Sequence, residues 1–321
     1  MSRITVITPC YNSARFIQDT IGSVLRQDIA DWEYILVDDG STDGTRDFLL
    51  DAAKRDSRLR VFEQENAGTG RARNLGAKMV STETKYLLFL DHDDMLEPTA
   101  LRLLSEYLDA HPNVCVAGCQ FQELNSGGVA VGTKTRSRWV PSVLGIPRPL
   151  RPQEFETPFV SFYCATGMGP FAMFRRSVFE AVGGWTTEFW PHEDTDLFCK
   201  MALAGKVHYL PKRLYRKRVH ADNGLNDYSR LVLAYDAFRE KWDKFQPRNA
   251  SEVATLRDAA RFYRASFRPL RHVKVGIKAF GEFIRHRDRS KLRFAFHLWR
   301  CALRDAIHYQ VNRPDSAEQS E

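Results

Sequence analysis

In Tyr86-Leu-Leu-Phe-Leu-Asp91-His92-Asp93-Asp94, an apolar run leads directly into an acidic turn. The apolar run at 86–90 is typical of a fully buried β-strand. Because unpaired carboxylates are costly to bury, those that follow should lie at a sheet edge that faces solvent or a ligand. Carboxylates two residues apart suit Mg²⁺ or Mn²⁺ held against a phosphate. The alternative is an acidic turn that only caps the helix expected from about residue 98.

Length and composition are those of an ordinary globular protein. The chain has 321 residues, of which 43% are hydrophobic and 12% aromatic, enough for one large domain or two smaller ones. No apolar run approaches the roughly 18 residues of a membrane-spanning helix. The N-terminus enters a strand at once and lacks a signal-peptide pattern, so we expect a cytosolic protein. The 6 cysteines are scattered, which favours free, buried thiols.

Positive charge is concentrated near the C-terminus. The net charge is +7, but residues 261–305 alone hold 13 Lys/Arg and 3 Asp/Glu. Apolar residues recur there at helical spacing, which is typical of helices that pack on the protein body or lie on an anionic membrane surface. Peripheral contact through 261–305 would place the protein at the cytoplasmic face of a membrane. No binding motif for nucleic acid accompanies the charge, so nucleic acid is not an expected partner.

Strands and helices alternate in the N-terminal part of the chain. Strands are expected at 4–8, 34–37, 59–62 and 86–90, with helical patterns between them. This alternation predicts right-handed βαβ units and a mostly parallel sheet. In such sheets, ligands bind outside the carboxyl ends of the strands. Polar turns lie at those ends, at 9–12, 38–41 and 91–94, so we expect one crevice lined by all three.

The rest of the chain is less regular. A helix is expected at 98–111, strands at 114–119, 171–174, 207–210 and 214–219, a hairpin at 120–131, and a helix at 177–182. The segment 132–161 has no periodic pattern, and loops of that length often contact substrates. Beyond residue 226 the pattern is helical. We therefore predict an α/β domain at 1–224 and a basic, mainly helical region at 225–321.

Several motifs stand in a recognisable order. They are Val6-Ile-Thr-Pro9-Cys-Tyr11-Asn12, Val37-Asp38-Asp39-Gly40-Ser41-Thr42-Asp43, Asn66-Ala-Gly68, Ala72-Arg73-Asn74, Leu90-Asp91-His92-Asp93-Asp94 and Glu193-Asp194. Each is weak alone, but the ordered set resembles family 2 of the GT-A fold, the inverting glycosyltransferases that use nucleotide sugars. The resemblance covers about residues 1–220. It implies a Rossmann-like, mostly parallel sheet with flanking helices and a glycan or lipid-linked acceptor.

The resemblance implies that the first two turns bind the nucleotide. Pro9 and Tyr11 would line the nucleobase, with Tyr11 stacked on it, and Asn12 belongs to the same turn. Asp39 would accept a hydrogen bond from a base N–H, which uracil has, so we expect a UDP-linked donor. The structural alternatives are a packed turn residue at Tyr11 and a helix cap at Asp39.

The third motif is expected to approach the base or the phosphates. We favour Arg71 for this contact, because Arg73 is placed to pack within the helix, and Asn74 is assigned to the same donor site. Gly68-Thr-Gly70 does not form the G-x-G-x-x-G pattern of dinucleotide-binding proteins, and a P-loop is absent. NAD binding and ATP hydrolysis are therefore not favoured.

Asp91 and Asp93 resemble the D-x-D motif of the family. In that interpretation Asp93 binds Mn²⁺ or Mg²⁺, and Asp91 contacts the ribose, or the ion through water. His92, between them, is assigned to the donor site, and Asp94 supports the turn. The ion would bridge the diphosphate and neutralise the charge that develops as it leaves.

Two later segments complete the resemblance. Asp194 would be the general base that removes the acceptor hydroxyl proton, with Glu193 the second candidate base or an acceptor contact. A carboxylate pair that caps a helix is the structural alternative. The stretch 215–220 resembles the Tyr-Arg-x-His end of the catalytic domain, and Arg218 fits the spacing to His220 better than Arg216 does. His220 would be a third metal ligand or a diphosphate contact, unless it is a plain polar residue at a strand end.

Two other classes of function compete with a glycosyltransferase. A metal-dependent nucleotidyltransferase also places carboxylate-bound metal on a nucleotide phosphate. It should carry a glycine-rich, basic loop after the first strand, and Cys10-Tyr-Asn-Ser lacks one. A non-catalytic sugar-nucleotide-binding module of the same fold would not need Asp91, Asp93 and Asp194 together.

Overall fold

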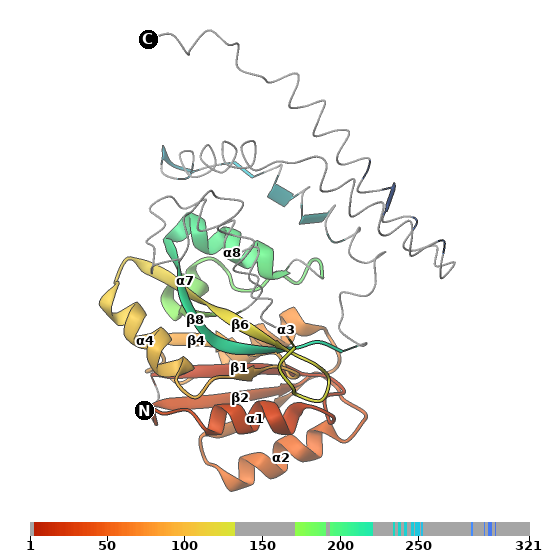
Figure 1. The fold of residues 1–321 in the computed structure, drawn as a ribbon. Helices are drawn as coiled ribbons and strands as arrows, with labels where there is room; N and C mark the ends of the chain where they lie inside the picture. The colour runs from red at the N-terminus through yellow and green to blue at the C-terminus, as the bar shows by residue number, and fades with distance from the viewer. Residues whose placement is uncertain are drawn as a thin grey trace, which may run out of the picture. The chain divides into compact units, whose positions relative to one another are not determined.

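The computed structural model describes residues 3–131, 171–190 and 193–220, together with scattered positions between 234 and 299 (Figure 1). The chain divides into two compact units, Met1–Ala221 with Pro247–Ala259, and Asp222–Gln246 with Ala260–Glu321. The domain boundary predicted at residue 224 and the segment 132–161 lie outside the described residues. The basic segment 261–305 lies almost wholly outside them, so its membrane contact stays a prediction. Within the described part of the chain, no helix is long and apolar enough to span a bilayer.

The N-terminal strands form the parallel half of the sheet, as predicted. They are β1 (Ile4–Cys10), β2 (Trp32–Asp38), β3 (Leu59–Glu63) and β4 (Tyr86–Phe89), in the spatial order β3-β2-β1-β4. The helices between them are α1 (Ile17–Leu25), α2 (Thr45–Arg55) and α3 (Thr69–Lys78). Every residue of β1 and β2 is buried, as is typical of the central strands of a parallel sheet that is covered on both faces.

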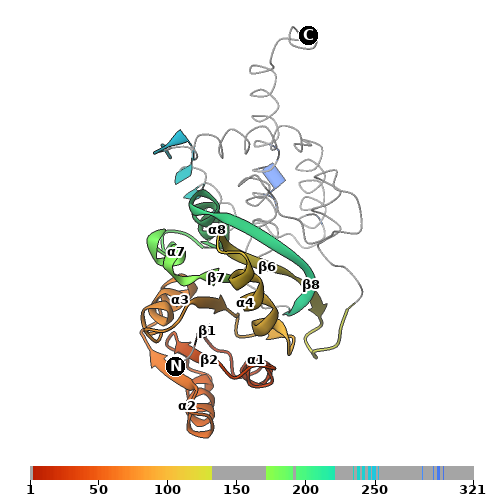
Figure 2. The same ribbon diagram turned by 90° about the vertical axis from the view of Figure 1, so that its left-hand side faces the viewer.

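The second half of the sheet is mixed. Beyond β4 lie β7 (Ala172–Arg175), β6 (Val114–Leu124), β8 (Lys206–Arg218) and the short β5 (Met95–Leu96). Strand β7 runs antiparallel to both β4 and β6, whereas β6 and β8 are parallel. The helices of this half are α4 (Ala100–Ala110), α7 (Arg176–Ala181) and α8 (Glu193–Ala204) (Figure 2). The expected α/β architecture with a mostly parallel sheet is therefore confirmed.

Two local expectations for β6 and β8 were wrong. The strands expected at 207–210 and 214–219 are one continuous strand, β8. Its register against β6 jumps from Cys119 opposite Leu210 to Gln120 opposite Arg213, so the two residues at 211–212 form a bulge rather than a break. Strand β6 also extends to Leu124 rather than ending at 119. The hairpin expected at 120–131 is present, with Leu124 paired antiparallel to Ala130.

Helices cover both faces of the sheet. Apolar residues of α1, α2 and α4 pack on one face, and those of α3, α7 and α8 pack on the other. A close approach occurs at Gly76 of α3, where an added Cβ would lie 2.5 Å from the Ile7 side chain and 3.3 Å from that of Val37. Only a residue without a side chain lets α3 lie this close to β1 and β2.

Gly76→Ala should therefore destabilise the protein, whereas the matched change Gly22→Ala in α1 should not. We expect Gly76→Ala to cost about 1–3 kcal/mol, because the added methyl group overpacks the contact with β1. At Gly22 the nearest atom to an added Cβ is the end of the flexible Arg26 side chain, so the gain in helix propensity should dominate. Urea unfolding of both variants measures the difference. Equal midpoints for the two variants would contradict the tight α3 contact.

Candidate active site

The polar turns after β1, β2 and β4 lie at the same edge of the sheet, as the parallel order of these strands requires (Figure 1). The backbone N–H of Asp39 donates to the carbonyl of Cys10 at 2.8 Å. The backbone N–H of Asn12 donates to Ser41 Oγ at 3.0 Å, and Asn12 Oδ1 accepts from the N–H of Thr42 at 2.9 Å. Asn12 therefore joins the first turn to the second, and its φ of 48° is the left-handed conformation that asparagine tolerates.

The residues assigned to the nucleobase lie at these first two turns. Pro9 is a buried residue of β1 opposite Val37, and the Tyr11 side chain is 47% exposed beside it. The buried Asp39 carboxylate accepts from the N–H groups of Ala67 and Gly68, at 2.8 and 2.9 Å, and from the Gln64 side chain at 2.6 Å. It therefore holds the turn that begins α3. A base contact by Tyr11 or Asp39 stays a prediction.

Two arginines of α3 have different positions. Arg71, which the sequence favoured for the nucleotide, is exposed, and its role stays a prediction. Arg73 is only 3% exposed. Its Nη2 donates to Asp91 Oδ1 at 2.6 Å, its Nη1 donates to Glu193 Oε1 at 3.0 Å, and its guanidinium lies 4.3 Å from the Trp185 ring centre.

Sequence reasoning missed this function of Arg73, although a signal for it was present. Arg73 shares a helix face with the buried Gly76 and Ala77. A guanidinium on a core-facing position needs carboxylate partners, and only the acidic motifs offered them. The next residue, Asn74, pairs its side-chain amide with the backbone of Trp185, at 2.8 and 3.0 Å. Together the two residues hold the loop that leads into α8.

The carboxylates of the acidic turn after β4 have different partners. Asp93 Oδ2 lies 2.8 Å from His220 Nε2, so the structure brings together two of the predicted metal-binding residues. Asp91 points instead to Arg73 and remains about one-third exposed. The backbone carbonyl of His92 accepts from Thr20 Oγ1 at 2.8 Å, which fixes the turn to α1. In the described part of the chain, no three metal-ligating side chains gather at one point.

Asp94 is buried and accepts from the backbone N–H of Arg218 at 2.7 Å. Burial raises the pKa of Asp94 well above its usual range, and the charges of Asp93 and Asp91 raise it further. A carboxyl group in this position supports the turn, which is the role expected of Asp94 from the sequence.

The two carboxylates at the start of α8 differ in environment. Glu193 is buried, and burial raises its pKa to about 7 despite the nearby Arg73, with the charge of Asp194 acting in the same direction. Asp194 is half-buried, and its Oδ1 accepts from the N–H of Thr195 at 2.6 Å. One guanidinium is thus shared between Asp91 and Glu193, so it does not fully compensate both carboxylates.

The raised pKa of Glu193 predicts a pH-dependent stability. The folded state holds this proton more tightly than the unfolded chain does, so the contribution is complete below about pH 4.5 and is lost as the pH rises through about 7. Unfolding temperatures measured between pH 4.5 and 8 should fall less steeply for Glu193→Gln than for the unaltered protein. The matched change Glu63→Gln, at an exposed ion pair with Arg46, should leave the slope unchanged. Parallel curves for all three proteins would refute the assignment.

The fold and the acidic edge define a class, the GT-A type of α/β domain. Residues 5–183 match the family described as glycosyl transferase family 2, and the chain belongs to that family. The chain is 37% identical over 123 residues to an uncharacterized glycosyltransferase, EpsJ, of Bacillus subtilis, covering 38% of the chain and 35% of the relative. It is 28% identical over 221 residues to chondroitin synthase of Pasteurella multocida, covering 68% of the chain and 21% of that protein. The chain thus spans well under half of either relative.

Solved structures show the same fold. TarS of S. aureus, residues 1–349 in complex with UDP-GlcNAc, aligns with a TM-score of 0.62 at 17% identity, covering 96% of this chain and 87% of that one. The mannosyltransferase PcManGT of Pyrobaculum calidifontis, in complex with GDP-Man and Mn²⁺, aligns with a TM-score of 0.59 at 18% identity, covering 95% and 87%.

Proposed function

We propose that the protein is an inverting glycosyltransferase that moves a sugar from a nucleoside-diphosphate donor, UDP-linked, to a glycan or lipid-linked acceptor. The observation that carries the proposal is the Asp93–His220 pair beside the Arg73-held carboxylates of Asp91 and Glu193. Groups that can bind a metal therefore lie together with basic and acidic groups at the carboxyl ends of the parallel strands. Ligands of α/β proteins bind at this end of the sheet.

The residues present fit a divalent ion, Mn²⁺ or Mg²⁺. Asp93 and His220 offer one carboxylate and one imidazole, 2.8 Å apart. Such ions are often held by one or two protein groups and complete their coordination with phosphate oxygens and water. Bound there, the ion would neutralise the charge of the departing diphosphate. Asp91 remains open enough to contact the ribose or an ion-bound water.

Of the remaining residues, some would contact the nucleobase and others would take part in the sugar transfer. Tyr11 offers an exposed ring for stacking on the nucleobase, and Asp39 lies at the neighbouring turn. Asp194, at the start of α8, removes the acceptor hydroxyl proton while that oxygen attacks the anomeric carbon opposite the diphosphate. A single in-line displacement inverts the configuration. Glu193 lies one residue away and is available to hold the acceptor.

The known relatives support this class of reaction without choosing the donor. TarS was solved with UDP-GlcNAc and PcManGT with GDP-Man and Mn²⁺, and chondroitin synthase is among the related sequences. Measuring the affinity of the protein for UDP and for GDP shows whether its site prefers uracil or guanine.

Metal-dependent nucleotide binding tests the donor site. Calorimetry should show UDP binding about tenfold or more tightly with Mn²⁺ than without it, and Asp93→Asn should abolish the difference, because it removes the charged metal ligand. Asp47→Asn makes the same chemical change on the exposed face of α2 and should retain the effect. If Mn²⁺ leaves UDP affinity unchanged in the unaltered protein, the proposed function fails.

Asp194→Asn tests the catalytic base. We expect UDP and Mn²⁺ to bind as before, because Asp194 does not contact the Asp93–His220 pair. Turnover of the donor sugar found by screening UDP- and GDP-sugars should fall by about 10²–10⁴-fold, the usual contribution of a positioned base. Asp47→Asn again serves as the control. Full turnover by Asp194→Asn would move the base to another residue, with Glu193 the first to examine.

A further inference from the structure

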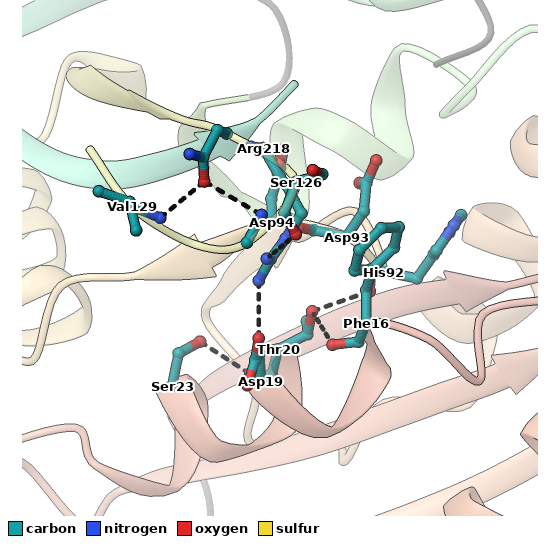
Figure 3. Close-up of polar contacts among 12 residues, drawn as sticks. Phe16, Asp19, Thr20, Ser23, His92, Asp93, Asp94, Ser126, Val129 and Arg218 are labelled. Atoms are coloured by element: carbon teal, nitrogen blue, oxygen red, sulfur yellow. Dashed lines mark hydrogen bonds and ion pairs between the residues drawn. The ribbon is translucent and has the colours of Figure 1, made fainter. Parts of the chain in front are cut away.

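Arg218, the last residue of β8, is an almost fully buried cation next to the acidic turn. Its side chain is 2% exposed, and its polar groups reach three separate segments. The backbone N–H donates to Asp94 Oδ1 at 2.7 Å, and Nε donates to the backbone carbonyl of Asp93 at 3.0 Å. The two terminal nitrogens donate to the carbonyl of Ser126 at 3.0 Å and to Asp19 Oδ2 of α1 at 2.8 Å (Figure 3).

These contacts lie next to the Asp93–His220 pair. Arg218 holds the backbone of Asp93 and the carboxyl group of the next residue, so it fixes the turn from which the Asp93 side chain projects. His220 follows Arg218 by two residues, and its Nε2 meets Asp93 Oδ2. The same arginine therefore connects the chain that follows Asp93 to the chain that leads into His220.

Phe16, the residue that precedes α1, completes this arrangement. The His220 ring lies 4.8 Å from the Phe16 ring, centre to centre, and the Arg218 guanidinium lies 4.9 Å from the same ring centre. Phe16 thus contacts both residues, while Asp19 anchors the guanidinium one turn further along the helix. Helix α1 follows the Tyr11–Asn12 turn, so it joins the nucleobase turn to the acidic turn.

We propose that Arg218 is a positioning residue that orients Asp93 and His220 for a divalent ion, with Asp19 and Phe16 holding the guanidinium in place. This inference rests on the proposed function. A planar guanidinium has several donors in a fixed geometry, so it holds groups from different segments at once. A lysine in its place retains the charge but lacks that geometry. Groups of this kind, which contact the ligands rather than the metal, typically change metal affinity by about 10–100-fold when they are altered.

The closing experiment measures Mn²⁺ affinity in the presence of saturating UDP, by the loss of the free Mn²⁺ electron paramagnetic resonance signal. Arg218→Met should weaken Mn²⁺ binding by about 10–100-fold, and Arg218→Lys should restore only part of it. Because removal of a buried arginine can prevent folding, Asp19→Asn provides a second test. The Asp19 side chain is 59% exposed, so this variant should fold and still lose Mn²⁺ affinity in the same direction.

A matched control lies on the same strand. Arg216 forms an ion pair of similar length with Glu97, at 2.6 and 2.9 Å, and is 42% exposed. It has no contact with Asp93 or Asp94 in the described structure, so Arg216→Met should leave Mn²⁺ affinity unchanged. UDP affinity without metal should be the same in all folded variants, which separates positioning of the ligands from general loss of structure.

The outcomes distinguish this inference from the proposed function. If the unaltered protein binds Mn²⁺ no more tightly with UDP than without it, the donor site itself is wrong. If it binds Mn²⁺ tightly and Asp19→Asn retains that affinity in full, Arg218 is a structural residue only and the inference is overturned. The inference is also overturned if Arg216→Met weakens Mn²⁺ binding as much as Arg218→Met does.

Discussion

Four carboxyl groups gather at one end of β4, and the rest of the structure depends on how their charge is compensated. Asp91, Asp93 and Asp94 come from the acidic turn, and Glu193 comes from α8. Buried or half-buried carboxylates are tolerated only when cations and N–H groups offset them. Arg73 provides a cation to Asp91 and Glu193, and the backbone N–H of Arg218 donates to Asp94. The guanidinium of Arg218 pairs with Asp19 of α1 beside them.

The two arginines make the acidic edge a point where distant segments meet. Arg73 joins the turn after β4 to a helix that begins about 100 residues later in the chain. Arg218 brings the end of β8 to the same turn and to the first helix. A site of this kind is held before a ligand arrives, so a nucleotide diphosphate would not have to order it. The carboxylates of Asp91 and Asp93 and a bound diphosphate would together favour a divalent cation, in agreement with the proposed function.

Local patterns in the sequence were sufficient for much of this fold. Apolar runs, intervening helical patterns and polar turns predicted the parallel strands β1 to β4 and the position of the polar turns at one edge of the sheet. The ordered motifs identified the family. The structure brings Asp93 and His220 together, and their binding of a metal stays a prediction. The sequence pattern was most reliable for the strands whose residues are all buried, β1, β2 and β4.

Contacts between distant segments were not predictable in the same way. The sequence placed Arg71 above Arg73, because helical spacing shows that Arg73 is buried and does not show which carboxylates meet it. The spacing to His220 matched Arg218 to the arginine of the Tyr-Arg-x-His stretch, but its burial follows only from the packing of α1 and the hairpin at 125–129 against β8. The bulge in β8 was taken for a break, since a proline such as Pro211 occurs both at bulges and at strand ends.

The most direct test is the position of the metal in a crystal of the protein grown with UDP and Mn²⁺. Anomalous diffraction identifies Mn²⁺ independently of any assumption about its ligands. We predict an anomalous peak in contact with the Asp93 carboxylate, the His220 imidazole and oxygens of the diphosphate, with Arg73 still bound to Glu193. A nucleotide bound at this edge with no metal between Asp93 and its phosphates, or a metal bound elsewhere, would contradict that arrangement.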